Sequence, residues 1–251
     1  MIAHLRIATW NCNNAIAEDG SVFTLSEGGG ADLVLEGVDL LAAQEVPFID
    51  GNPPDDFTAL LAQADLMYVA QYVLSTAYNR DASVDSGLVL AARWPLNQIV
   101  RRQFENPALV ARVGESIWES DDKGYIVATL QVDGLRVSFT CTHLLPFADF
   151  GVAIDSPPAI ASWKQLEKHA EDAVEGSDVA VIAGDFNRNS RVLGPLISAA
   201  YGLESRNTRA AVDAIFVSQS VPVKAVRTFR TLSDHHLLIG DFGWSTSVRT
   251  E

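Results

Sequence analysis

The chain has 251 residues, 48% of them hydrophobic, and a formal net charge of −14 from 32 acidic and 18 basic residues. This length supports one large globular domain, which we expect over residues 1–251. The charge excludes a broad basic surface for long duplexes, and every apolar stretch is far shorter than the ~20 residues that span a bilayer. With no signal-peptide pattern at the N-terminus, these features predict a cytoplasmic protein.

The predicted elements are mostly short strands with a few helices between them. Apolar runs predict strands at 5–11, 39–46, 72–76, 87–92, 125–132, 135–142, 179–186, 212–218, 223–230 and 236–243. Helical spacing, or a preceding proline or glycine, predicts helices at 31–37, 55–67, 158–174 and 195–201. Asp133-Gly134 is a strong two-residue turn signal and predicts a hairpin. Segments 13–26 and 104–123 have the composition of exposed loops.

Five short polar clusters stand beside the predicted strands, at 10–11, 44–45, 142–143, 184–187 and 233–235. The first four follow an apolar run, whereas Asp234-His235 precedes one, and Asp213 precedes another. If all the clusters share one site, the last strands must run opposite to the earlier ones. An all-parallel doubly wound sheet would put them at the wrong edge, so the pattern predicts a mixed or antiparallel sheet.

The clusters supply carboxylates, carboxamides and histidines, a set that suits a hard divalent metal and hydrolysis of a phosphate ester. Asp185 and Asn187 are two residues apart, so they share one side of a strand end and can orient a water and a phosphate oxygen. Of the adjacent His235 and His236, one faces the site. We expect this to be His235, with Asp213 as its orienting partner.

Each residue also has a structural interpretation when it is taken alone. Glu45 and Asp213 can be solvated residues at strand ends, and His143 can be a core histidine bonded to the backbone. Asn11 and the 185–187 segment can be turn residues. The functional interpretation therefore depends on whether the clusters meet in space.

The remaining histidines and the cysteines are expected to have no catalytic role. His4 and His169 are expected on the surface, and Cys12 and Cys141 as reduced, buried thiols. The sequence contains no P-loop, dinucleotide, zinc or nucleophile-elbow pattern. Water is therefore the expected nucleophile.

Taken together and in order, the motifs resemble those of the endonuclease/exonuclease/phosphatase superfamily, which has the deoxyribonuclease I-like fold. The matching segments are 9–11, 44–46, 86–90, 142–144, 184–187, 212–218 and 233–235. Single motifs are weak, but the ordered set is specific and covers nearly the whole chain. The resemblance implies a four-layer α/β sandwich in which two mixed, mostly antiparallel sheets pack face to face with helices outside.

The resemblance also implies which residues act on the substrate. The implied catalytic residues are His143, Asp185, Asn187, Asp213 and His235. Asp185 and Asn187 would orient the attacking water and the phosphate, and either Asp185 or His235 would take the proton of the water. His143 would stabilise the phosphate or protonate the leaving oxygen.

A divalent cation, Mg²⁺ or Mn²⁺, is the cofactor that the resemblance implies. Glu45 would bind it, assisted by Asn11 and Asp234. Basic residues near the motifs are few, and Arg188 is the expected substrate contact.

We therefore expect a metal-dependent phosphodiester hydrolase, a nuclease that acts on DNA or RNA with a small footprint. Only about 25 residues separate Asn187 from Asp213, where many nucleases of the family carry long insertions, and no tyrosine of the abasic-site enzymes is matched. The expected partner is a phosphodiester such as short or single-stranded nucleic acid, without a membrane or an obligate protein partner. The alternatives are a phosphomonoesterase of a small metabolite and a non-catalytic binding module on the same fold.

Overall fold

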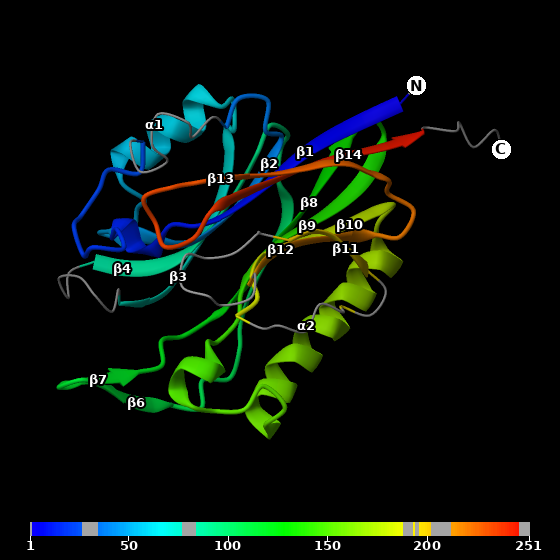
Figure 1. Cartoon of the computed structure of the whole chain (residues 1–251). Helices are drawn as coiled ribbons and strands as arrows, with labels where there is room; N and C mark the ends of the chain where they lie inside the picture. The colour runs from blue at the N-terminus through cyan, green and yellow to red at the C-terminus, as the bar shows by residue number, and fades with distance from the viewer. Residues whose placement is uncertain are drawn as a thin grey trace.

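Two six-stranded sheets and a separate two-stranded hairpin form the β-structure of the described residues. The computed structural model describes residues 2–26, 35–76, 84–187, 193, 196–201 and 212–245. Figure 1 shows the two sheets face to face, with the helices on their outer sides.

The first sheet has the strand order β13-β14-β1-β2-β4-β3. Its strands are β1 (Ile2–Asn11), β2 (Leu40–Ile49), β3 (Tyr68–Thr76), β4 (Val84–Ala92), β13 (Val223–Phe229) and β14 (Leu237–Ser245). Only β1 and β2 pair in parallel, and β14 runs antiparallel to β1.

The second sheet has the strand order β11-β12-β10-β9-β8-β5. Its strands are β5 (Asn97–Gln103), β8 (Gly124–Val132), β9 (Leu135–His143), β10 (Val179–Asp185), β11 (Leu196–Tyr201) and β12 (Asp213–Ser218). Here β9 and β10 are the parallel pair, and β12 runs antiparallel to β10. The mixed sheets and the reversed direction of the late strands confirm the expectation drawn from the order of the polar clusters.

Four layers result from the way the apolar residues alternate along the strands. Side chains from both sheets, among them Ile7 and Phe139, meet in a core between them. On the outer face of the first sheet, Trp10 packs in a cluster with residues of helix α1 (Asp55–Gln63). On the outer face of the second, Ile182 packs in a cluster with residues of α2 (Pro157–Gly176). The four-layer α/β sandwich is therefore confirmed.

Local sequence signals explain several of these elements. Asp133 and Gly134 both have positive φ, 50° and 82°, as the tight β8–β9 hairpin requires. Helix α2 begins with proline and buries Trp163, Leu166 and Ala170 at helical spacing. No helix within the described residues is both long and apolar enough to cross a bilayer.

Three sequence-based expectations about secondary structure are wrong. The segment expected as a helix at 195–201 contains strand β11, because pairing along the edge of β12 overrides its local helical preference. Segment 104–123 is not only a loop, since it contains the β6–β7 hairpin (Val110–Val113 and Ser116–Glu119). Strand β2 continues through Pro47, which pairs with β4 beyond the end of the β1 pairing. The helix expected at 31–37 lies largely outside the described residues.

His169 is not the surface residue that the sequence predicts. Its ring stacks on Tyr125 with centroids 4.6 Å apart, and its Nε2 lies 2.8 Å from the Thr140 hydroxyl. Burial lowers the pKa of His169 to about 4, so the ring is neutral where it lies between its own helix, α2, and the sheet. His4 is exposed as expected, and Cys12 and Cys141 are free, buried thiols.

Candidate active site

The site lies at one end of the sandwich, where the side chains that alternate into the core become polar. Ile7 of β1 lies between the sheets, and Asn11, four residues later, points the same way. Strands β9, β10 and β12 repeat this pattern with His143, Asp185 and Asp213. Asp185 is in register with His143 on one side and with Asp213 on the other. The predicted clusters therefore meet where the two sheets face each other.

Glu45 reaches the site only because strand β2 contains a bulge. The pairing of β2 with β4 gains one extra residue between Ala43 and Val46, and Glu45 has a φ of 49°. Both Ala43 and Val46 pack in the outer cluster, so regular alternation would turn Glu45 away from the second sheet. A bulge re-aims a side chain in this way and stores local strain.

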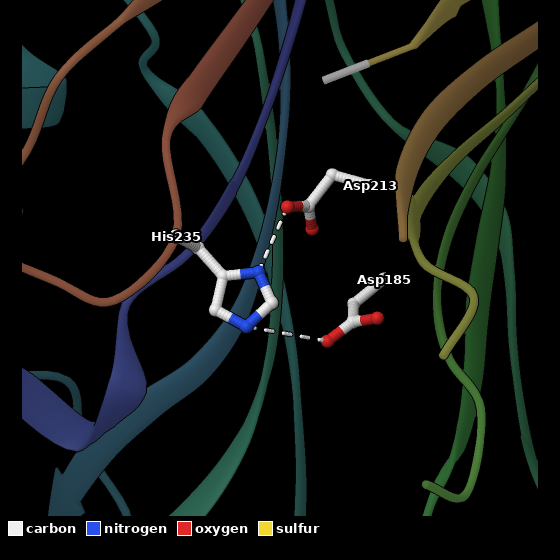
Figure 2. Close-up of side chains that lie close together, drawn as sticks. All are labelled: Asp185, Asp213 and His235. Atoms are coloured by element: carbon white, nitrogen blue, oxygen red, sulfur yellow. Dashed lines mark hydrogen bonds and ion pairs between the residues drawn. The ribbon is translucent and has the colours of Figure 1, made fainter. Parts of the chain in front are cut away.

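Asp213, His235 and Asp185 form a chain of three interacting side chains (Figure 2). Nδ1 of His235 lies 2.8 Å from Oδ2 of Asp213, and its Nε2 lies 3.8 Å from Oδ2 of Asp185. Burial disfavours the charged ring, but the neighbouring carboxylates, Asp213 foremost, together outweigh it and raise the pKa of His235 well above its usual value. His235 is therefore held as a cation with its second nitrogen toward Asp185.

Asp185 is the best-connected carboxyl group of the site and is almost fully buried. Its Oδ1 accepts the backbone N–H of Asn187 at 2.8 Å, and its Oδ2 accepts Nδ2–H of Asn11 at 3.0 Å. Burial raises the pKa of Asp185 to about 7, even though the charge of His235 opposes the shift. This carboxyl group can therefore exchange a proton near neutral pH.

His143 is in the opposite electrostatic state from His235. Its Nε2 lies 3.1 Å from Nδ2 of Asn187 and 3.4 Å from Oδ2 of Asp185. Burial, together with the charge of Lys123, lowers the pKa of His143 well below its usual value. Nε2 of the neutral ring accepts Nδ2–H of Asn187. The backbone of Asn187 has a positive φ of 45°.

Lys123 is a site residue that the sequence reasoning missed. It directly precedes β8, and its Nζ lies 3.2 Å from Oε1 of Glu45. Burial opposes ionisation of Glu45, but nearby positive charge, chiefly that of Lys123, outweighs it and lowers the pKa of Glu45 to about 2. The hairpin register places Gly124 opposite His143, so the predicted β8–β9 turn already contained a signal for this lysine.

The other expected ligands occupy less central positions. Asn11 donates to Asp185, while its Oδ1 accepts the backbone N–H of Asn13 at 2.9 Å. Asp234 lies at the rim with 45% of its side chain exposed, and its Oδ1 is 3.9 Å from Nε2 of His235. Arg188 lies outside the residues that the structure describes.

The donor set fits a hard divalent cation. Asp185, Asp213 and His235 each have a potential ligand atom within 4.8 Å of the others, and His235 becomes a ligand only when it loses its proton. Oδ1 of Asp213 is buried and has no hydrogen-bond partner among the described residues, and Glu45 adds an ionised carboxylate nearby. Oxygen-rich sites of this kind prefer Mg²⁺ or Mn²⁺. Burial raises the pKa of the Cys141 thiol to about 12, so it does not compete as a soft thiolate ligand.

Solved structures with the same fold cover nearly all of this chain. An endonuclease/exonuclease/phosphatase from Beutenbergia cavernae matches with a TM-score of 0.71 and 19% identity over 96% of this chain and 72% of its own. Sphingomyelinase C from Streptomyces griseocarneus matches at 0.60 and 17% over 97% and 100%. Humanized D. rerio TDP2 matches at 0.57 and 15% over 95% and 98%.

Comparison with curated proteins finds no sequence that matches this chain. The family model of the endonuclease/exonuclease/phosphatase family, by contrast, matches residues 8–235 and so includes every element that brings a residue to the site. Its members hydrolyse phosphoesters and use divalent metals, in agreement with the donors described above. The chain belongs to the endonuclease/exonuclease/phosphatase family and is a phosphoester hydrolase.

Proposed function

We propose that residues 1–251 form one cytoplasmic catalytic domain that cleaves phosphodiesters in short or single-stranded DNA or RNA with Mg²⁺ or Mn²⁺. The observation that carries the proposal is the Asp185 carboxyl group. It lies between a charged histidine, His235, and a neutral one, His143, and its pKa is about 7. A water-activating group needs such a pKa at neutral pH.

In the proposed mechanism Asp185 accepts the proton of the attacking water. His235 is the weaker candidate for this role, because Asp213 keeps it protonated. The backbone N–H of Asn187 fixes Oδ1 of Asp185, and Asn11 fixes Oδ2, so the carboxylate keeps one orientation. Positioning of this kind accounts for much of the catalysis of phosphoryl transfer.

The two histidines are proposed to act at the phosphate in different ways. His235 can donate Nε2–H to a phosphate oxygen or to the leaving oxygen, because Asp213 occupies its other nitrogen. His143 is neutral and accepts Nδ2–H of Asn187, so it orients the asparagine beside the phosphate.

Glu45, with Asn11 and Asp234, would hold the divalent cation. When bound, the cation supplies positive charge to the phosphate oxygens in the transition state. The ionised state of Glu45 and the partly buried position of its carboxylate, opposite the second sheet, support this assignment.

The charge of the protein supports a small substrate footprint. The net charge is −14, and Asp121, Asp122 and Asp234 flank the site in sequence or in space. A long duplex would be repelled along such a surface, whereas a short strand needs only the metal, His235 and the proposed contact Arg188.

A substrate panel with a matched inactive variant tests the proposal. Wild type and Asp185→Asn are compared on single-stranded DNA, RNA, duplex DNA and p-nitrophenyl phosphate, with Mg²⁺ or with chelator. We expect wild type to cleave the short strands only with Mg²⁺, and Asp185→Asn to cleave none of them. Preferential hydrolysis of p-nitrophenyl phosphate would replace the nuclease assignment with a phosphomonoesterase, and cleavage by Asp185→Asn would remove the proposed base.

A further inference from the structure

Lys123 is the only lysine or arginine that is buried among the residues the structure describes, with 7% of its surface exposed. Buried lysines are rare unless they are paired. The partner of Lys123 is Glu45, which comes from the opposite sheet. An ammonium group is therefore enclosed against the carboxylate that is proposed to bind a metal.

Both carboxylate oxygens of Glu45 are already engaged. Oε1 lies 3.2 Å from Nζ of Lys123 and 3.7 Å from Nε2 of His143. Oε2 accepts Nδ2–H of Asn14 at 3.3 Å. A cation that coordinates Glu45 on the lone pairs left free therefore comes within a few ångströms of these three groups.

A cation bound to Glu45 would disrupt the contact with Lys123 rather than the other two. Like charges a few ångströms apart in a buried site repel strongly, so an ammonium group and a divalent ion cannot share one carboxylate oxygen at no cost. Asn14 carries no charge that would repel the ion, and Nε2 of His143 lies farther from Oε1 than Nζ of Lys123 does, at 3.7 against 3.2 Å. The flexible four-carbon stem of lysine allows Nζ to move while the backbone stays in place.

We propose that Lys123 holds the place of the metal on Glu45 in the metal-free enzyme, and that metal binding releases its ammonium group to contact the substrate phosphate. This inference rests on the proposed function of the site as a metal-dependent hydrolase. It gives Lys123 two effects of opposite sign. The lysine weakens metal binding because it competes for Glu45, and it strengthens substrate binding because it pairs with the phosphate.

Titration calorimetry with Mn²⁺ alone tests the first effect on chelator-treated protein. Lys123→Met should bind Mn²⁺ about ten-fold more tightly than wild type, because the competing cation is gone. Lys123→Arg, which keeps a cation at this position, should stay close to wild type. Lys168→Met is the matched control, because its lysine lies on α2 with 67% of the side chain exposed and pairs with Asp172.

The Michaelis constant for a short single-stranded oligonucleotide at saturating Mn²⁺ tests the second effect. It should rise about ten-fold in Lys123→Met and recover in Lys123→Arg. A lysine with a merely structural role would weaken both metal and substrate binding when replaced. If Lys123→Met folds poorly, Lys123→Gln keeps a polar side chain and serves in both measurements.

The outcomes separate the inference from the proposed function. If wild type binds no Mn²⁺ or cleaves nothing, the proposed function itself is wrong. If wild type binds and cleaves, but the Lys123 variants bind Mn²⁺ as wild type does or more weakly, Lys123 does not compete for Glu45. An unchanged Michaelis constant would overturn the phosphate contact.

Discussion

Two clusters of charged side chains, one within the first sheet and one between the two sheets, have opposite electrostatic character. One is the arginine cluster, which we define as Arg6 of β1, Arg227 of β13 and Asp241 of β14. The other, which we call the catalytic cluster after its proposed role, consists of Asp185 at the end of β10, Asp213 at the start of β12 and His235 just before β14.

In the arginine cluster each oxygen of one carboxylate has its own cationic donor. Nε of Arg6 lies 2.7 Å from Oδ1 of Asp241, and Arg227 contacts Oδ2. Partial burial opposes ionisation, but the two arginines outweigh it and hold the pKa of Asp241 below its usual value. Because both oxygens of Asp241 are paired with an arginine, the cluster contributes to stability and leaves no carboxylate oxygen free to react.

The catalytic cluster has two carboxyl groups for one histidine, and no arginine is among the contacts described for it. Burial raises the pKa of Asp185 to about 7, and Oδ1 of Asp213 has no partner among the described residues. A carboxylate in this fold is thus either neutralised, as Asp241 is in the first sheet, or left incompletely paired, as Asp185 and Asp213 are in the second. The difference depends on whether arginines or a histidine contact the carboxylate.

Removing divalent metal should lower activity at least as much as any single substitution in either cluster. Because Glu45 and the catalytic carboxyl groups then lack their cation, hydrolysis should fall by about 10³-fold or more, while the fold persists. Rates with excess chelator and after Mg²⁺ is restored, together with circular dichroism, measure this. Full activity in chelator would break the link between unsatisfied carboxylates and catalysis.

The Asp213–His235 pair should behave as one unit in catalysis. Asp213→Asn and His235→Ala should each lower kcat/KM by about 10²-fold or more. The double variant should cost little beyond either single change, because both remove the same oriented cation. A double-mutant cycle measures the coupling, with His236→Ala as a control of far smaller effect. Additive losses would show that the two residues act separately.

Breaking the arginine cluster should affect stability and leave chemistry alone. Asp241→Asn leaves Arg6 and Arg227 without their carboxylate and should lower the free energy of unfolding by about 2 to 3 kcal/mol. Urea denaturation measures this loss, and kcat/KM at a temperature where the variant is folded should match wild type. A catalytic defect would mean that the two clusters communicate.

The pH dependence of stability should show the smallest effect and differ in sign between the clusters. The native pKa of Asp185 is raised to about 7, so between pH ~4 and ~7 the native state holds a proton that the unfolded chain has lost. The free energy of unfolding should therefore fall as pH rises through this window, by about 1 to 2 kcal/mol in chelator. The raised pKa of His235 acts in the same direction.

Asp241 should act with the opposite sign. Its native pKa is lowered, so its contribution is present above its usual value and is lost as pH falls below it. Urea denaturation at several pH values should show a flatter profile for Asp185→Asn near neutral pH and an unchanged one for Asp241→Asn there. The reverse pattern would contradict the assignments.

Strand alternation explains why the side chains that the sequence singled out lie together in the structure. Each of Asn11, His143 and Asp185 follows an apolar run and lies an even number of residues after a core-facing residue of the same strand. Strand alternation therefore points these side chains in the same direction as the core residues. The direction of the last strands followed from the position of Asp213 and His235 before their strands, and the structure confirms it.

The features that sequence missed depend on tertiary contacts. Glu45 was predicted as a site residue from its motif, but regular alternation does not encode the bulge through which it enters the site. Lys123 stands at the end of a polar stretch and is buried only because the opposite sheet supplies its partner. Segment 195–201 has helical character locally but forms β11 through edge pairing, and His169 is enclosed because α2 lies on the sheet.

The central claim is that the site retains an electrostatically unfavourable buried carboxyl group for chemistry, and Asp185→Asn tests it most directly. The measurement is the free energy of unfolding at pH 8 in chelator, together with kcat/KM in Mg²⁺, for Asp185→Asn and wild type. We expect the variant to lose nearly all activity and to be at least as stable as wild type, because a buried charge is removed. A variant that is clearly less stable, or that remains active, would contradict the account.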